Sequence, residues 1–205
     1  MRPTRFMVRM GFVAVGCGSL LLNGVAPASA NWAGKSGQTG CDDLNQADNK
    51  SHSIYRAELE ANIQAAVNWQ ASNILTNSTL VTPSFASSLT STTDVVVRDR
   101  YYDDYCGYNW WTAANGGVIG AAECDSLTAG DPDCEQHTLR ISNVWGDQTS
   151  TAQRRDVVSH EMGHTLGLSH RIDPDEASVM GPSAPYTTAF YTNHDLRHLA
   201  NDLDD

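Results

Sequence analysis

The chain has few basic residues and no long hydrophobic run. It contains 13 Lys and Arg against 24 Asp and Glu. Three of the basic residues and none of the acidic ones fall in the first thirty positions, so the remainder has ten against 24, a formal net charge of −14. A surface of that sign repels nucleic acid and anionic lipid, so neither is an expected partner. No stretch approaches 18 apolar residues, so no transmembrane helix is predicted.

The first thirty residues have the three parts of a secretory signal peptide. Three arginines come first, Met10–Leu22 is mostly apolar, and Ala28-Ser29-Ala30 is a small-residue cleavage pattern. Lipid attachment at Cys17 is the alternative, disfavoured because the usual Leu three residues earlier is absent. We therefore predict a signal peptide at 1–30, a single domain at 31–205, and a protein that is secreted and monomeric.

Cysteine is also scarce, and no Cys-x-x-Cys pair occurs. Four cysteines remain after residue 30, and an even number in an exported protein suggests two disulfides. Of the three possible connectivities we favour Cys124–Cys134, which closes a short polar loop, together with Cys41–Cys106. A zinc site built from cysteines is the alternative, but oxidation is expected to prevail outside the cell.

Hydrophobic periodicity predicts an α+β domain. The chain offers three helical patterns and three short strand patterns, the helices at 54–75, after Ser150 and at 192–203, the strands at 94–98, 116–122 and 136–144. Ser150 and Gln153 fit a capping box at the start of the second helix. Connections are expected at 76–93 and 125–135.

Residues 160–170 read His-Glu-Met-Gly-His-Thr-Leu-Gly-Leu-Ser-His. His160 and His164 are four residues apart on the second helix, so their rings lie one turn apart on one face and can reach one metal ion. Gly167 is the expected helix stop, and the bend there returns His170 as a third ligand. Glu161 points toward the same side and can hold a metal-bound water without being a ligand.

Three protein ligands leave a fourth position open, which is typical of a catalytic rather than a structural site. All-histidine ligation with an open position favours zinc, although cobalt and nickel are not excluded by geometry alone. A solvated histidine-rich face or an adventitious metal site is the simpler alternative. Glu161 and Gly167, both in register, argue against it.

The pattern His-Glu-x-x-His-x-x-Gly-x-x-His resembles that of the metzincin zinc endopeptidases. The resemblance implies that Met180, in Ser178-Val179-Met180-Gly181-Pro182, forms a turn beneath the metal without binding it. It also implies a twisted, mostly parallel sheet with one antiparallel edge strand along the cleft, an active-site helix and a C-terminal helix.

Within the metzincins the chain looks most like the matrixins. Asp173-Pro174 after the third histidine and Met180-Gly-Pro182 carry this likeness, and the helix near Asp195 resembles the matrixin C-terminal helix. The matrixin propeptide switch is absent, because Cys41 lies in Thr-Gly-Cys-Asp rather than Pro-Arg-Cys-Gly.

These features predict a secreted zinc endopeptidase in which zinc-activated water attacks the peptide carbonyl and Glu161 is general base and then acid. An extended substrate is expected to pair with the edge strand at Val118, Ile119, Gly120 and Ala121, a segment whose small residues allow close approach of the two backbones. By resemblance, Tyr186 would shape the pocket beyond the scissile bond. The rival functions are a non-catalytic exported protein with structural zinc, and a zinc hydrolase acting on a non-protein amide.

Two weaker patterns are interpreted as surface. His194 and His198 are four residues apart, but no third ligand is evident nearby, so a polar helix face is favoured over a second metal site. Acidic groups such as 131–133 and 173–176 could hold structural calcium. None has the ordered spacing of a known calcium loop, so solvated loops are favoured.

Overall fold

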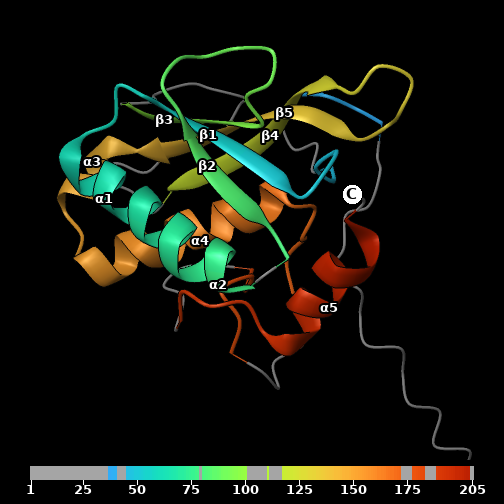
Figure 1. Cartoon of the computed structure of the whole chain (residues 1–205). Helices are drawn as coiled ribbons and strands as arrows, with labels where there is room; N and C mark the ends of the chain where they lie inside the picture. Colours follow the sequence, from blue (N-terminus) through green and yellow to red (C-terminus); the bar gives the residue numbers. More distant parts are fainter. Residues whose placement is uncertain are drawn as a thin grey trace, which may run out of the picture.

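A computed structural model describes residues 37–40, 45–78, 80–100, 110, 117–171, 177–182 and 188–203. Its centre is a five-stranded sheet in the order β2-β1-β3-β5-β4 (Figure 1). The first four strands in this order, β2, β1, β3 and β5, are parallel to one another. β4 lies at the edge and runs antiparallel to β5. The expected α+β fold, with a mostly parallel sheet and one antiparallel edge strand, is therefore confirmed.

The first strand was not expected. β1 covers Ser51–Ala57, and its buried residues His52 and Ile54 alternate with more exposed ones. The predicted helix at 54–75 is therefore wrong in its first part. Buried and more exposed residues alternate there, as in a strand, and no Gly or Pro separates this stretch from the helical pattern that follows. Helix α1 begins only at Ala61, after Glu58 takes a positive φ of 55° and reverses the chain.

The other strands differ from prediction mainly at their ends. β2 (Thr82–Ala86) lies within the segment expected to be a connection, and it pairs with β1 as an exposed edge. β3 (Val95–Arg100) and β5 (Cys134–Ser142) confirm the strands predicted at 94–98 and 136–144, except that β5 starts two residues earlier and 143–144 are helical. β4 (Gly120–Leu127) starts later and extends further than predicted, so that 125–127 are strand rather than loop.

The helices cover one face of the sheet. α1 (Ala61–Gln70) continues through a π-helical turn at Ala71–Leu75 into α2 (Thr76–Ser78), and a short helix α3 (Asn143–Asp147) follows β5. α4 (Thr151–Thr165) packs against α1, β4 and β5, while α5 (Asn193–Asp202) lies beyond it, away from the sheet (Figure 1). The predicted capping box at Ser150 and Gln153 is present. The core lies between the helices and the sheet and includes Val97, Leu139 and Met162, all fully buried.

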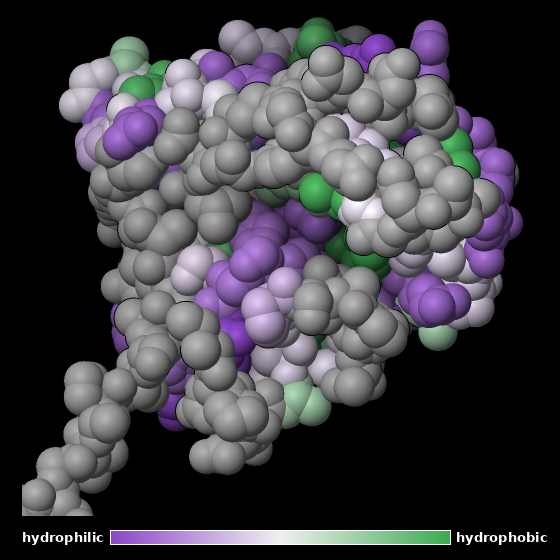
Figure 2. Space-filling model, turned by 180° about the vertical axis from the view of Figure 1, so that it is seen from behind, coloured by the Kyte–Doolittle hydropathy of each residue, from purple (hydrophilic) through white to green (hydrophobic). Residues whose placement is uncertain are grey.

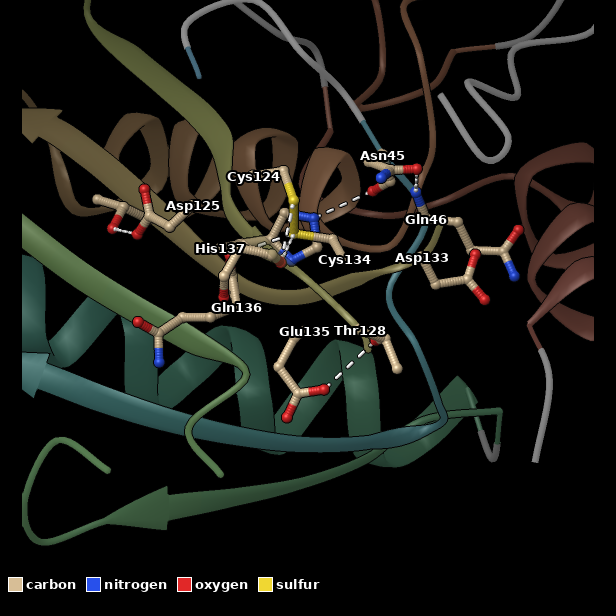
Figure 3. Close-up of a disulfide and its surroundings, with 12 residues drawn as sticks. Asn45, Gln46, Cys124, Asp125, Thr128, Asp133, Cys134, Glu135, Gln136 and His137 are labelled. Atoms are coloured by element: carbon tan, nitrogen blue, oxygen red, sulfur yellow. Dashed lines mark hydrogen bonds between the residues drawn. A yellow bond between two sulfur atoms is a disulfide. The ribbon is translucent and has the colours of Figure 1, made fainter. Parts of the chain in front are cut away.

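The predicted Cys124–Cys134 disulfide is present and joins β4 to β5 (Figure 3). Beside it the buried ring of His137 donates from Nε2 to the carbonyl oxygen of Asn45 at 3.0 Å. The strand backbone at this point also binds the preceding segment, since Cys134 N–H donates to Gln46. The predicted Cys41–Cys106 bond lies outside the described residues, as does the predicted signal peptide.

The surface of the described residues is largely hydrophilic. Figure 2 shows the face opposite to that of Figure 1, which is hollowed near its centre, with hydrophilic residues gathered in the hollow. Only four large hydrophobic side chains are strongly exposed among the described residues: Phe85, Leu89, Leu127 and Phe190. No helix in the described part of the chain is long and apolar enough to cross a membrane.

Candidate metal centre and catalytic site

The second half of α4 carries the first two histidines into the interior. Its first turn is exposed, but the helix is buried from Val157 to its end at Thr165. Gly167 follows with a φ of +91°, the left-handed conformation that glycine adopts without a side-chain penalty. Gly167 N–H donates to the carbonyl of His164, and Leu168 N–H donates to that of Gly163, both at 3.0 Å. This pair of bonds is the Schellman motif, and it redirects the chain so that His170 returns to the helix.

The three imidazoles converge as predicted. The Nε2 atom of His160 lies 3.0 Å from that of His164 and 3.1 Å from that of His170. Nδ1–H of His160 donates to the Val179 carbonyl at 2.7 Å, and Nδ1–H of His164 donates to the Leu168 carbonyl at 2.6 Å. With the protons held on Nδ1, the Nε2 lone pairs of these two rings face a common point.

That arrangement fits a metal ion. Tetrahedral ligands about 2.1 Å from zinc lie about 3.4 Å from one another, close to the separations between these nitrogens. Lone pairs facing one another with no donor between them are repulsive, and a cation at their centre removes the repulsion. Among the described residues, these three histidines are the only group of His, Cys, Asp or Glu whose ligand atoms lie close enough together to hold an ion. The alternative of a structural calcium site therefore finds no support among the described residues.

The electrostatics of the histidines also favour a metal. Burial lowers the pKa of His164 to about 4, and it lowers the pKa values of His160 and His170 below the ordinary 6.5. A histidine binds a metal only as the neutral ring. These three rings are thus already in the ligand form near neutral pH.

Glu161 is buried beside the triad. Only 4% of it is exposed, and this burial raises the pKa of its carboxyl to about 8 in the metal-free chain. A dication nearby would lower that pKa, because it stabilises the carboxylate. The side chain lies beneath the first residue of β4: a Cβ added to Gly120 would stand 2.7 Å from Glu161 Oε1.

Met180 packs against α4. Its side chain is fully buried and contacts Gly163, whose missing side chain leaves the room that the sulfur fills. The turn around it also orients the site, because the neighbouring Val179 carbonyl accepts the hydrogen bond from His160. Arg171, next to the third histidine, donates from its backbone N–H to the Met180 carbonyl at 2.7 Å.

A buried polar network anchors this turn and was not predicted. Ser178 donates to the carboxylate of Asp195 at 2.7 Å and accepts from Met180 N–H at 3.0 Å. The same carboxylate caps α5 by accepting from the Thr192 backbone N–H at 2.7 Å. Nη1 of Arg171 donates to the Thr192 hydroxyl at 3.0 Å. The sequence does hold one local signal, since Thr192 and Asp195 have capping-box spacing.

The structure describes some of the remaining predicted site residues, and others lie outside its described residues. Gly120 and Ala121 begin the edge strand, while Val118 and Ile119 lead into it, with Ser142 N–H donating to the Ile119 carbonyl at 3.0 Å. Tyr186 and the Asp173-Pro174 segment lie outside the described residues. His194 and His198 are adjacent on α5, their ring centroids 4.9 Å apart, and join no group of three ligands in the described part of the chain.

Comparison with known proteins agrees with this geometry. The family model described as Metallo-peptidase family M12B, reprolysin-like, matches residues 38–193, which include the whole sheet, α4 and the triad. A comparison with curated proteins gives no match to the chain. The metzincin resemblance is confirmed, while the narrower likeness to matrixins is not supported over reprolysins. The chain belongs to the reprolysin-like metallopeptidases of family M12B, which are zinc endopeptidases of the metzincin group.

Proposed function

We propose that this metallopeptidase is a secreted endopeptidase that cleaves extracellular proteins, with Glu161 as general base and then general acid. The observation that carries the proposal is the position of Glu161, whose buried carboxylate lies between the histidine-bearing helix and the edge strand β4. A carboxylate that had only a structural role would be expected to pair with a basic side chain. Among the described residues no basic side chain pairs with it, and burial alone accounts for the raised pKa of Glu161.

The roles of the chain's own residues follow from this arrangement. A zinc ion held by His160, His164 and His170 would supply a Lewis acid that polarises the scissile carbonyl and acidifies water. Glu161 accepts the proton of the attacking water on its carboxylate and passes it to the nitrogen of the departing amine. Met180 supports the triad from below by packing, and it donates no ligand.

The substrate is proposed to bind as an added strand. β4 is the edge of the sheet, and its first residues are small, so an extended peptide can approach the backbone at Val118, Ile119, Gly120 and Ala121. Tyr186 is proposed to line the pocket beyond the scissile bond. These assignments would place the cleaved bond above the end of α4 where the three rings meet.

Secretion is proposed from two features. The signal-like segment at 1–30 precedes the matched region, and the Cys124–Cys134 disulfide is a bond that persists in oxidising compartments. Residues 1–30 would then be removed before the enzyme acts.

The test is identification of cleaved bonds by mass spectrometry after incubating the purified protein with a peptide mixture. We expect internal cleavages that disappear with a zinc chelator and return when zinc is restored. Intact peptides under all conditions would favour the non-catalytic zinc protein. Intact peptides with turnover of a non-peptide amide would favour the other rival. Either result would overturn the proposal.

A further inference from the structure

Gly120 stands at a position where the backbone does not require glycine. It opens β4 opposite Ile141 of β5, and it is absent from the described glycines with positive φ. Any residue can adopt its conformation, and glycine weakens a strand relative to alanine. The reason for a glycine here must therefore be space.

The space is filled by Glu161. A Cβ built on Gly120 would lie 2.7 Å from Cγ, 2.7 Å from Oε1 and 2.9 Å from Cδ of that side chain, and all three distances are shorter than real Cβ contacts allow. One partner would have to move. The strand backbone is held by its ladder with β5 from Gly120 to Leu127, whereas the glutamate can rotate about its side-chain bonds. Added bulk at position 120 would thus displace the carboxylate.

We propose that Gly120 is a positioning residue for the general base: its missing side chain lets the edge strand close directly over Glu161 and hold that carboxylate beside the histidine triad. The proposal rests on the proposed role of Glu161. It differs from the expectation that position 120 is small only to admit the substrate backbone. A substrate-approach role predicts a raised KM, whereas a positioning role predicts a lowered kcat with KM retained.

The test compares Gly120→Ala with Gly146→Ala. The control adds the same methyl to a glycine of α3, where the built Cβ would meet Cδ1 of Ile63 at 2.9 Å, another flexible side-chain end. Peptide cleavage, zinc content and thermal unfolding are measured for both. We expect Gly120→Ala to lower kcat by about 10- to 100-fold. We expect it to keep one zinc per chain and a KM within about twofold of wild type. The control should keep wild-type kcat.

A second comparison tests the contact between Gly120 and Glu161 by thermal unfolding, which does not depend on activity. In a Glu161→Ala background the carboxylate is gone, so Gly120→Ala should raise Tm by about 1 to 4 °C, as alanine usually does in place of glycine in a compatible strand. In the wild-type background that rise should be absent. If Gly120→Ala alone does not fold, folding of the double variant would support the same contact, and its failure to fold would overturn it.

Wild-type kcat in Gly120→Ala, a raised KM with kcat unchanged, or equal Tm shifts in both backgrounds would each overturn the proposal. The single variant Glu161→Ala separates this outcome from failure of the proposed function. If Glu161→Ala is inactive and Gly120→Ala behaves as wild type, only the positioning role fails. If Glu161→Ala remains active, the proposed function fails as well.

Discussion

The hydroxyl of Ser178 donates to the carboxylate of Asp195 at 2.7 Å, which joins the turn beneath the histidine triad to the start of α5. Both groups are buried, and Asp195 has no exposed surface. Ser178 also accepts a hydrogen bond from Met180 N–H, and the carbonyl of the neighbouring Val179 accepts the one from Nδ1–H of His160. The contact between Ser178 and Asp195 therefore helps to orient the ring of His160. Helix α5 therefore helps to hold the turn that orients His160.

Ser178→Ala should weaken both the fold and the metal site. It leaves the Met180 N–H and one carboxylate lone pair without the hydroxyl, at a cost of about 1–3 kcal/mol in the free energy of unfolding. Zinc affinity should fall by about 10-fold, because the turn that orients His160 is less restrained. Urea unfolding and a competitive zinc titration measure the two effects. Ser126→Ala, at an exposed position of β4, is the control and should change neither. Equal zinc affinities in wild type and Ser178→Ala would disprove the supporting role.

Gly167→Ala should lower zinc affinity in addition to stability. Alanine at a φ of +91° is strained by about 1–2 kcal/mol, and relaxation of that strain would turn His170 away from the other two rings. The matched control is Gly130→Ala in the β4–β5 loop, at a φ of +85° with open space around its Cβ. It should lose comparable stability and keep wild-type zinc affinity. The same zinc titration distinguishes them, and equal losses of affinity would contradict the account of the bend.

Stability should fall as the pH is lowered through 6, because two histidines are buried without charge. Burial lowers the pKa of His52 to about 3 and that of His137 to about 4. The Nδ1 atom of each has no hydrogen-bond partner among the described residues, so a proton there would have no acceptor. Both rings titrate near 6.5 when unfolded, so their contribution is complete above pH 6.5 and is lost toward pH 4, at about 2–3 kcal/mol each.

In the metal-free protein Asp94 and Glu161 oppose this trend and His164 adds to it, because burial raises the pKa of Glu161 to about 8 and lowers that of His164 to about 4. Burial raises the pKa of Asp94 to about 6, so the folded chain takes up that proton before the unfolded chain does, and stability rises as pH falls from 6 toward 3.8. Urea unfolding of the metal-free protein at pH 7.5 and 5 should still show net loss at pH 5. His52→Gln, which can still donate to Thr165, should show a smaller loss. An unchanged pH dependence in this variant would contradict the role of His52.

The sequence was most informative where structure is local. The triad follows from helical spacing and a glycine stop within eleven residues, and the predicted capping box of α4 lies within four. The misassigned start of α1 shows the limit, since the alternating pattern of 51–57 passes into the helical pattern with no Gly or Pro between them. The contacts of Gly120 with Glu161, and of Ser178 with Asp195, bring together separate segments, and no spacing rule reveals them. His52 was not singled out either, because its contact with Thr165 at the end of α4 joins residues 113 positions apart.

The central claim is that Glu161 performs proton transfer at a metal held by three histidines, and Glu161→Gln tests it most directly. Glutamine keeps the size of the side chain and its place beneath β4 but cannot accept the proton. The measurement is kcat for peptide cleavage together with the zinc content of the same sample. We predict one zinc per chain, an unchanged Tm within about 2 °C, and a kcat lowered by at least about 100-fold. A zinc-loaded Glu161→Gln protein that cleaves peptides at the wild-type rate would contradict the account.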